Sequence, residues 1–148
     1  DDIEGEISVI RLSHSGARVA MIIDGHVYIA AVAQSSSGDK RIVNAREVGP
    51  EVSGSALSLD WNADGSLIVG TSSSQSPVWR IEQDGSSAST MPTGNITAPV
   101  VAVATSPTKL FITDSHAMLE LPSTVMDETN WREVSGLQGR RSSPIVSN

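Results

Sequence analysis

The chain has 148 residues, a net charge of −7, a pI near 4.8 and no cysteine. The acidic balance and an aromatic content of only 3% argue against nucleic acid as a partner, because such binding needs basic surface and stacking platforms. Without cysteine the chain has no disulfide, no thiolate nucleophile and no thiolate metal site.

Strand-forming residues dominate the apolar positions. Valine and isoleucine together number 27, against 12 for leucine and methionine, and β-branched side chains favour the pleated surface of a sheet. The longest apolar run, residues 27–33, is far too short to cross a membrane. We therefore expect a chain of short strands.

One hairpin pattern occurs three times along the chain. Two extended runs flank a tight turn at residues 13–16, 62–65 and 106–108. The first strands of these hairpins start at Ile7, Ala56 and Val100, and the final Ser-Pro-Ile-Val at residues 143–146 resembles Ala-Pro-Val-Val at residues 98–101. A repeat of this length indicates an architecture of stacked or radially arranged units.

Each period divides into four strand-sized pieces separated by polar or glycine-containing turns. The first period predicts strands at residues 7–12, 18–23, 27–33 and 41–48. The second predicts strands at residues 56–61, 66–71, 77–81 and 87–91. The third predicts strands at residues 100–105, 109–113, 117–121 and 131–134, with a loop and a helical turn between the last two.

Four short strands in each period are the signature of a β-propeller blade. We expect an all-β fold, a fragment of a β-propeller with about three four-stranded antiparallel blades and the start of a fourth. The predicted units are blades at residues 7–48, 56–91 and 100–134, and the inner strand of a next blade at residues 144–146. Propellers typically need four to eight blades to close, so we expect an arc of a larger ring; a β-sandwich is the alternative.

Several polar residues have spacings that could carry chemistry. Asp60 lies on a predicted inner strand, and we expect a solvated or hydrogen-bonded carboxylate there. Asp-x-His occurs in two equivalent turns, at residues 24–26 and 114–116. Imidazole and carboxylate are competent zinc ligands, but a predicted blade separates the pairs. We expect turns closed by the aspartates, each followed by an exposed histidine, and His14 as a further turn residue.

The sequence gives no support for an enzyme. The serines lie in predicted turns without the strand-to-helix context of a hydrolase nucleophile. Residues 62–65 depart from the Ser-x-Asp-x-Gly-x-x-Trp turn of sialidase-like propellers, because Asp64 and Gly65 are adjacent and the tryptophan is missing. We expect no catalytic residues, no metal and no cofactor.

Partner binding is the remaining role for the large side chains. We expect Trp61 and Trp79 to pack between blades, because one buried tryptophan ring removes about 150 to 250 Å² from water. Packing also remains the first expectation for Trp131. Trp and Arg are nevertheless enriched at interface hot spots, and the candidate partner-binding residues are Trp131, Arg132, Arg140 and Arg141.

Three stretches resemble the carboxy-terminal propeller of the LpqB family of mycobacterial lipoproteins. They are residues 7–48, residues 56–69 and, most specifically, the Asn-Trp-Arg-Glu-Val-Ser-Gly-Leu-Gln-Gly run at residues 130–139 with Ser-Pro-Ile-Val at residues 143–146. The resemblance implies an envelope protein with a lipidated amino-terminal cysteine, a GerMN-type domain and this propeller outside the cell membrane. Any membrane attachment would then come from a lipid anchor outside this segment.

The resemblance also implies a partner. Proteins of this family are associated with the sensor histidine kinase MtrB, so the implied activity is binding and modulation of the extracytoplasmic part of a two-component kinase, without catalysis. A glycan-binding or glycoside-hydrolysing propeller of the cell envelope is the alternative function. Because three blades leave apolar faces open, we expect this segment to self-associate or to bind the missing amino-terminal part of the same protein.

Overall fold

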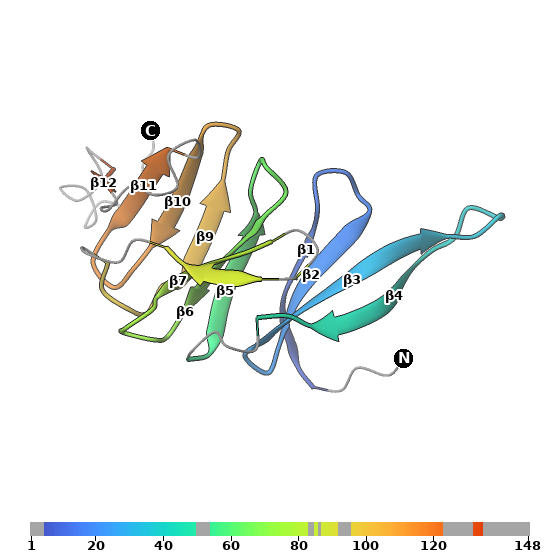
Figure 1. The fold of residues 1–148 in the computed structure, drawn as a ribbon, viewed down its shortest axis with the longest axis horizontal. Coiled ribbons are helices and arrows are strands. Elements are labelled where there is room, and N and C mark those ends of the chain that lie inside the picture. Colours follow the sequence, from blue (N-terminus) through green and yellow to red (C-terminus); the bar gives the residue numbers. More distant parts are fainter. Residues whose placement is uncertain are drawn as a thin grey trace, which may run out of the picture.

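The computed structural model describes residues 5–49, 54–82, 85, 87–91, 96–122 and 132–134. Within these ranges, twelve strands form three separate four-stranded antiparallel sheets (Figure 1). Sheet 1 contains β1 (Ile7–Leu12), β2 (Arg18–Ile23), β3 (His26–Gln34) and β4 (Lys40–Glu47). Sheet 2 contains β5 (Ala56–Trp61), β6 (Leu67–Thr71), β7 (Val78–Ile81) and β8 (Ala88–Thr90). Sheet 3 contains β9 (Ala102–Thr105), β10 (Lys109–Thr113), β11 (Met118–Pro122) and β12 (Arg132–Glu133).

Every sheet is an up-and-down meander in which strands that follow one another in sequence are hydrogen-bonded neighbours. Strand β5 contacts both β1 and β9, so the first strands of the three sheets lie in a row (Figure 1). The expected all-β fold with three four-stranded antiparallel units is confirmed. The expected strand at residues 144–146 and the expected helical turn in the loop before β12 lie outside the described residues.

Strand β9 begins two residues later than predicted. The reason is that the backbone N–H of Val100 donates to the carbonyl of Thr71 in sheet 2, at 3.0 Å, instead of joining the ladder of sheet 3. An equivalent bond, from the N–H of Ala56 to the carbonyl of Gly25 at 2.9 Å, links sheet 2 to sheet 1. The segments that lead into β5 and β9 are therefore each bound to the preceding sheet.

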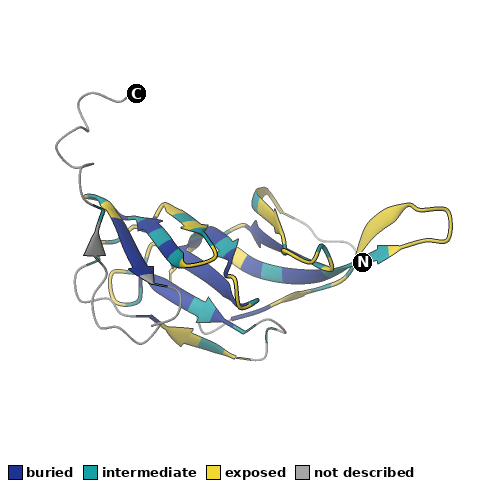
Figure 2. Cartoon of the chain, turned by 90° about the horizontal axis from the view of Figure 1, so that it is seen from above, coloured by how far each residue is buried: buried dark blue, intermediate teal, exposed yellow. Residues whose placement is uncertain are grey.

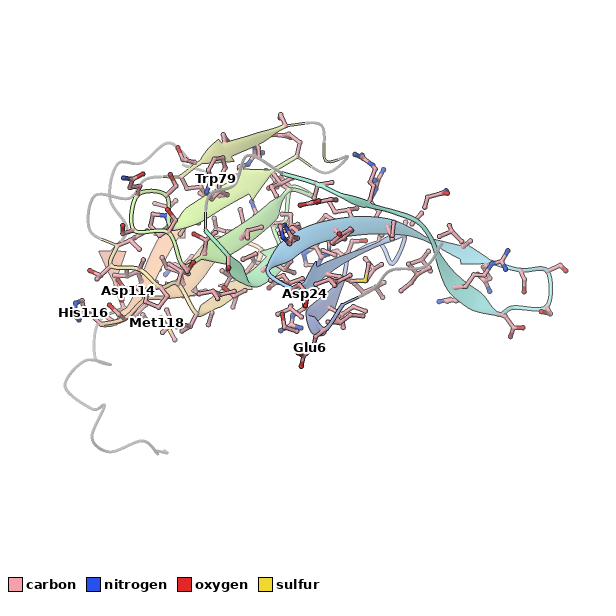
Figure 3. All side chains as sticks on the ribbon, turned by 90° about the horizontal axis from the view of Figure 1, so that it is seen from below. Glu6, Asp24, Trp79, Asp114, His116 and Met118 are labelled. Atoms are coloured by element: carbon pink, nitrogen blue, oxygen red, sulfur yellow. The ribbon has the colours of Figure 1, made fainter. Side chains whose placement is uncertain are left out.

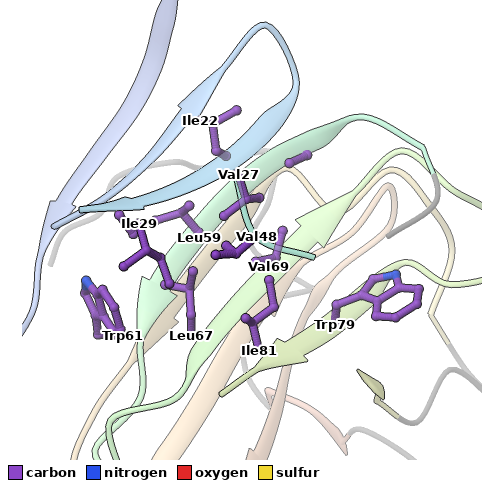
Figure 4. Close-up of a cluster of buried hydrophobic side chains, with 12 residues drawn as sticks. Ile22, Val27, Ile29, Val48, Leu59, Trp61, Leu67, Val69, Trp79 and Ile81 are labelled. Atoms are coloured by element: carbon purple, nitrogen blue, oxygen red, sulfur yellow. The ribbon is translucent and has the colours of Figure 1, made fainter. Parts of the chain in front are cut away.

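Apolar side chains fill the two seams between sheets. The first seam joins the face of sheet 1 that carries Ile22 and Ile29 to the face of sheet 2 that carries Leu59 and Trp61 (Figure 4). The second seam joins the opposite face of sheet 2 to sheet 3. All five residues of β6 are buried because sheet 2 is covered on both faces (Figure 2). In sheet 3, β10 alternates between buried and half-buried residues, whereas β2 of sheet 1 is buried from Val19 to Ile23.

Gly70 marks the closest approach in the second seam. A Cβ placed on this residue would lie 2.5 Å from Cγ1 of Val100 and 2.8 Å from its carbonyl oxygen. No real side chain tolerates such a distance to backbone, so β6 can approach the start of sheet 3 only because residue 70 has no side chain.

Gly70→Ala is expected to lower the free energy of unfolding by about 1–3 kcal/mol, because an added methyl group forces the seam apart. Urea denaturation measures the loss. Val100→Ala alone should also lower the free energy of unfolding. In the Gly70→Ala background this loss should be smaller by at least about 0.5 kcal/mol, because the shorter side chain at residue 100 makes room for the added methyl group. Strictly additive losses would show that the two residues do not share the seam.

Candidate interaction surface

The last residues of the inner strands β5 and β9 each form a hydrogen bond between neighbouring sheets, here called the seam bonds. Trp61 ends β5, and its Nε1–H donates to the carbonyl of Arg11 in sheet 1 at 3.1 Å. Thr105 ends β9, and its hydroxyl donates to the carbonyl of Trp61 at 2.6 Å. An indole N–H and a threonine hydroxyl thus form the bond between sheets at equivalent positions. The sequence predicted a packing role for Trp61 and none for Thr105.

Asp60 adds to the hydrogen bonds between sheet 2 and sheet 3. Its Oδ2 accepts from the backbone N–H of Thr105 at 3.1 Å, and its Oδ1 accepts from the N–H of Trp61 at 2.9 Å. The expectation of a hydrogen-bonded carboxylate at Asp60 is confirmed. The side chain ties sheet 2 to sheet 3.

The two Asp-x-His turns differ in structure. Asp114 is buried, and its Oδ1 accepts from the N–H groups of His116 and Ala117 at 2.7 and 2.8 Å, while its Oδ2 accepts from that of Thr97 at 2.9 Å. The expected turn with an exposed histidine is confirmed here. Burial tends to raise the pKa of Asp114, but these three N–H donors, with His116 nearby, outweigh it and hold the pKa below its ordinary value.

The first turn does not close in the expected way. Asp24 accepts from the N–H of Glu6 at 3.1 Å and not from its own turn, and its φ of 52° is left-handed. His26 is exposed, as expected, and its Nδ1 lies 2.9 Å from a carboxylate oxygen of Glu47. Figure 3 shows that Asp24 and Asp114 lie on different sheets. Among the described residues, no group of three or more histidines and acids is placed to hold a metal ion.

The hairpin turn of sheet 2 is also held by its own side chains. Asp64 Oδ1 accepts from the N–H and the hydroxyl of Ser66 at 2.9 and 2.6 Å, and Oδ2 lies 3.0 Å from Nη2 of Arg80, which also pairs with Glu82. Burial opposes ionisation, but the bonds from Ser66 and the guanidinium of Arg80 lower the pKa of Asp64. This carboxylate therefore has a structural use.

His14 lies in the β1–β2 turn, as predicted, and contacts the carbonyl that accepts one of the seam bonds. Its Nε2 is 3.2 Å from the carbonyl of Trp61, so the ring donates from this nitrogen. The turns after β1 and β5 border an open pocket of about 240 Å³, lined by Ser13, His14, Ser15, Trp61, Ala63, Asp64 and Gly65. Its histidine and aspartate already have partners within the fold.

Both described tryptophans pack as expected. Trp61 is only 1% exposed, and Trp79 is buried at the edge of the first seam with its Nε1–H donating to the carbonyl of Ser76 at 3.1 Å. The candidate partner residues are not placed: Trp131, Arg140 and Arg141 lie outside the described residues, and Arg132 is in β12 without a described side chain.

The second apolar face of sheet 1, here called the open face, packs against no described sheet. Val19, Met21 and Ile23 are nevertheless buried on it, at 4%, 2% and 2% exposed, and its most exposed apolar side chains lie on β1. Ile10, Met21 and Tyr28 are cross-strand neighbours on this face. Leu59, Val69 and Trp79 form the equivalent row of sheet 2 and pack against sheet 1. In sheet 1 no other described sheet covers this row, and Ile10 and Leu12 are 47% and 60% exposed. The sequence repeat contains a signal for this face. Leu12 is at the position in the first repeat that Trp61 has in the second, and Trp61 packs against the preceding sheet, which Leu12 does not have among the described residues.

A family model described as the lipoprotein LpqB beta-propeller domain matches residues 1–147. The chain belongs to the LpqB β-propeller family. Curated relatives include "Lipoprotein LpqB" from Corynebacterium diphtheriae, 49% identical over 95% of this chain, and from Corynebacterium jeikeium, 41% identical over 99%. The Mycobacterium tuberculosis protein of the same name is 28% identical over 96%. This member spans about a quarter of the length of these relatives, 24%, 25% and 24% respectively.

Solved structures agree with the LpqB propeller fold. A structure titled puromycin hydrolase superposes with a TM-score of 0.65 over 88% of this chain and 22% of its own, at 18% identity. Identity this low supports the fold alone, and the three sheets are blades of a propeller. No described helix of this LpqB family member is long and apolar enough to cross a membrane.

Acid should weaken the third blade through Asp114. Because its pKa is lowered on folding from the ordinary value of 3.8, the carboxylate stabilises the fold above that pH and loses its contribution as the pH falls through the lowered pKa. Asp114→Asn should lower the free energy of unfolding by about 1–2 kcal/mol at pH 7, because the new amide N–H group faces backbone N–H donors instead of accepting from them. Denaturation between pH 7 and 2 should show a smaller acid dependence in the variant. An unchanged acid dependence would contradict this role.

Proposed function

We propose that this chain is part of a non-enzymatic binding domain of an envelope lipoprotein, and that the domain binds the extracytoplasmic part of a two-component sensor histidine kinase. The family match over residues 1–147 carries the proposal. The relatives are named lipoproteins, which supports a location at the outer side of the cell membrane, with the lipid anchor outside this segment.

The use of the polar residues supports a binding role. Asp60, Asp64 and Asp114 look like candidates for chemistry in the sequence, but each carboxylate is held by hydrogen bonds that close a turn or a seam. These carboxylates give the alternative of a glycan-hydrolysing propeller no particular support. A domain whose carboxylates are engaged in internal hydrogen bonds would act through its surface. It would shift the kinase between two conformational states by binding one state more tightly than the other.

The open face of sheet 1 would carry a further blade in the parent protein. Its row of Ile10, Met21 and Tyr28 matches rows that are covered in sheets 2 and 3, and the relatives are about four times as long as this chain. We propose residues 7–48, 56–91 and 100–134 as successive blades and residues 144–146 as the inner strand of the next.

Two variants test the kinase partner. Arg140→Glu with Arg141→Glu, and separately Trp131→Ala, are expected to weaken binding to the purified extracytoplasmic domain of the kinase by about tenfold or more, because Trp and Arg dominate interface energies. Isothermal titration with the whole parent protein measures this. Thr108→Glu with Ser115→Glu, both exposed in turns of sheet 3, is the control for added negative charge elsewhere and should bind normally. Absence of binding by the unmodified protein would refute the proposal.

A separate experiment tests whether the open face of sheet 1 is a contact surface. Because no described sheet covers that face and Ile10 and Leu12 are 47% and 60% exposed on it, light scattering should show self-association. Ile10→Glu with Leu12→Glu should convert the chain to monomers. The control pair Thr108→Glu with Ser115→Glu should leave the association unchanged. Monomers at all concentrations for the unmodified chain would contradict this use of the face.

A further inference from the structure

The chain has an uneven distribution of charge. From Ile7 to Glu47, the span of sheet 1, the sequence has five basic and three acidic residues, whereas the other 107 residues hold five basic and fourteen acidic ones. Sheet 1 is therefore positively charged in a protein whose net charge is −7.

Four of the five basic residues of sheet 1 gather toward one end of it. Arg11 pairs with Ala20, Arg18 with Ala31 and Arg41 with Ala33 in the strand register. Because directly opposed residues share a face and alternate residues of β2 and β3 do too, the three arginines lie on one face of the sheet. Lys40 is adjacent, at the start of β4 on the other face.

The end of the β3–β4 hairpin projects beyond the other strands. Residues 32–42, here called the basic arm, continue the ladder from the Val32–Ile42 pair to the Gln34–Lys40 pair and end in a turn of three serines and a glycine. Figures 1 and 2 show the arm extending away from the three sheets with an exposed tip. Blade 2 has no such extension, because β7 and β8 contain only four and three residues.

The cations of this region are available to a partner. Of the ion pairs between described residues, those of Arg80 and Lys109 stabilise sheets 2 and 3, and none involves Arg11, Arg18 or the two basic residues of the arm. Arg11, Lys40 and Arg41 are exposed. The only acid in the arm, Asp39, accepts from the hydroxyl of Ser37 at 3.3 Å.

We propose that the basic arm and the adjacent arginines bind the anionic headgroups of a membrane surface, and so orient the blades on it. The cations are spread over both faces of this end of sheet 1 and along a projecting hairpin. The three arginines lie on the face that carries Ala20 and Ile29, and Lys40 lies on the other. Such a spread of charge suits a layer of phosphates better than a single small ligand. Leu12 and Ile42, 60% and 46% exposed at the same end, add apolar area, while the acidic remainder of the chain is repelled by such a surface. This inference rests on the proposed envelope location and not on the kinase partner.

Co-sedimentation with lipid vesicles tests the proposal. The unmodified chain should bind vesicles of equal parts phosphatidylglycerol and phosphatidylcholine, and the binding should disappear in about 1 M sodium chloride, where the screening length is about 3 Å. Lys40→Gln with Arg41→Gln should weaken it by about tenfold or more, because each basic residue contributes separately near an anionic surface. Circular dichroism should show that this variant keeps its fold, since both residues are exposed.

The control must remove the same charge elsewhere. In sheets 2 and 3 the basic side chains that the structure describes, Arg80 and Lys109, have structural ion pairs. The control is therefore Thr108→Glu with Ser115→Glu, which lowers the net charge equally and should weaken binding much less. Equal binding to pure phosphatidylcholine vesicles would overturn the proposal in favour of the open apolar face. No binding to either vesicle would also overturn it, and would leave the kinase experiment, which contains no lipid, unaffected.

Discussion

Apolar packing between sheets is the constraint on which this structure depends. A single four-stranded sheet cannot bury two apolar faces, and sheet 2 shows how the chain meets this condition: Trp61 and Leu67 pack toward sheet 1, whereas Ile68 and Val78 pack toward sheet 3. Burial on both faces makes the stability of each blade depend on its neighbours, as in other repeat architectures. The seams, rather than the individual sheets, are therefore the units that hold the fold together.

The seams also explain why Asp60, Thr105 and His14 use their polar groups in the fold. Two closely packed sheets leave backbone carbonyls at the ends of inner strands, and these must be satisfied as water is excluded. Thr105 and His14 both donate to the carbonyl of Trp61, while Asp60 accepts from the next sheet. Function is thus more reasonably sought on surfaces that no seam uses.

Local pattern was sufficient to predict the strands and most of the turns, because alternation of apolar residues and glycine or aspartate turns act over a few positions. It could not predict that Thr105 replaces Trp61 as a donor, since that bond joins residues 44 apart in sequence. The sequence also suggested that Asp24 and Asp114 behave alike. They differ because the N–H of Thr97 donates to Asp114, whereas the N–H of Glu6 donates to Asp24. Which donor lies near each aspartate depends on the arrangement of the sheets.

Sheet 1 combines two surfaces that differ in physical character. The face with Met21 and Tyr28 is apolar and continues the repeating seam, so covering it would give a dry and largely salt-independent contact. The basic arm is solvated, and its attraction to anions weakens as salt rises. A permanent blade contact and a reversible electrostatic one can therefore coexist on one sheet, because the arm extends past the edge at which the apolar row ends.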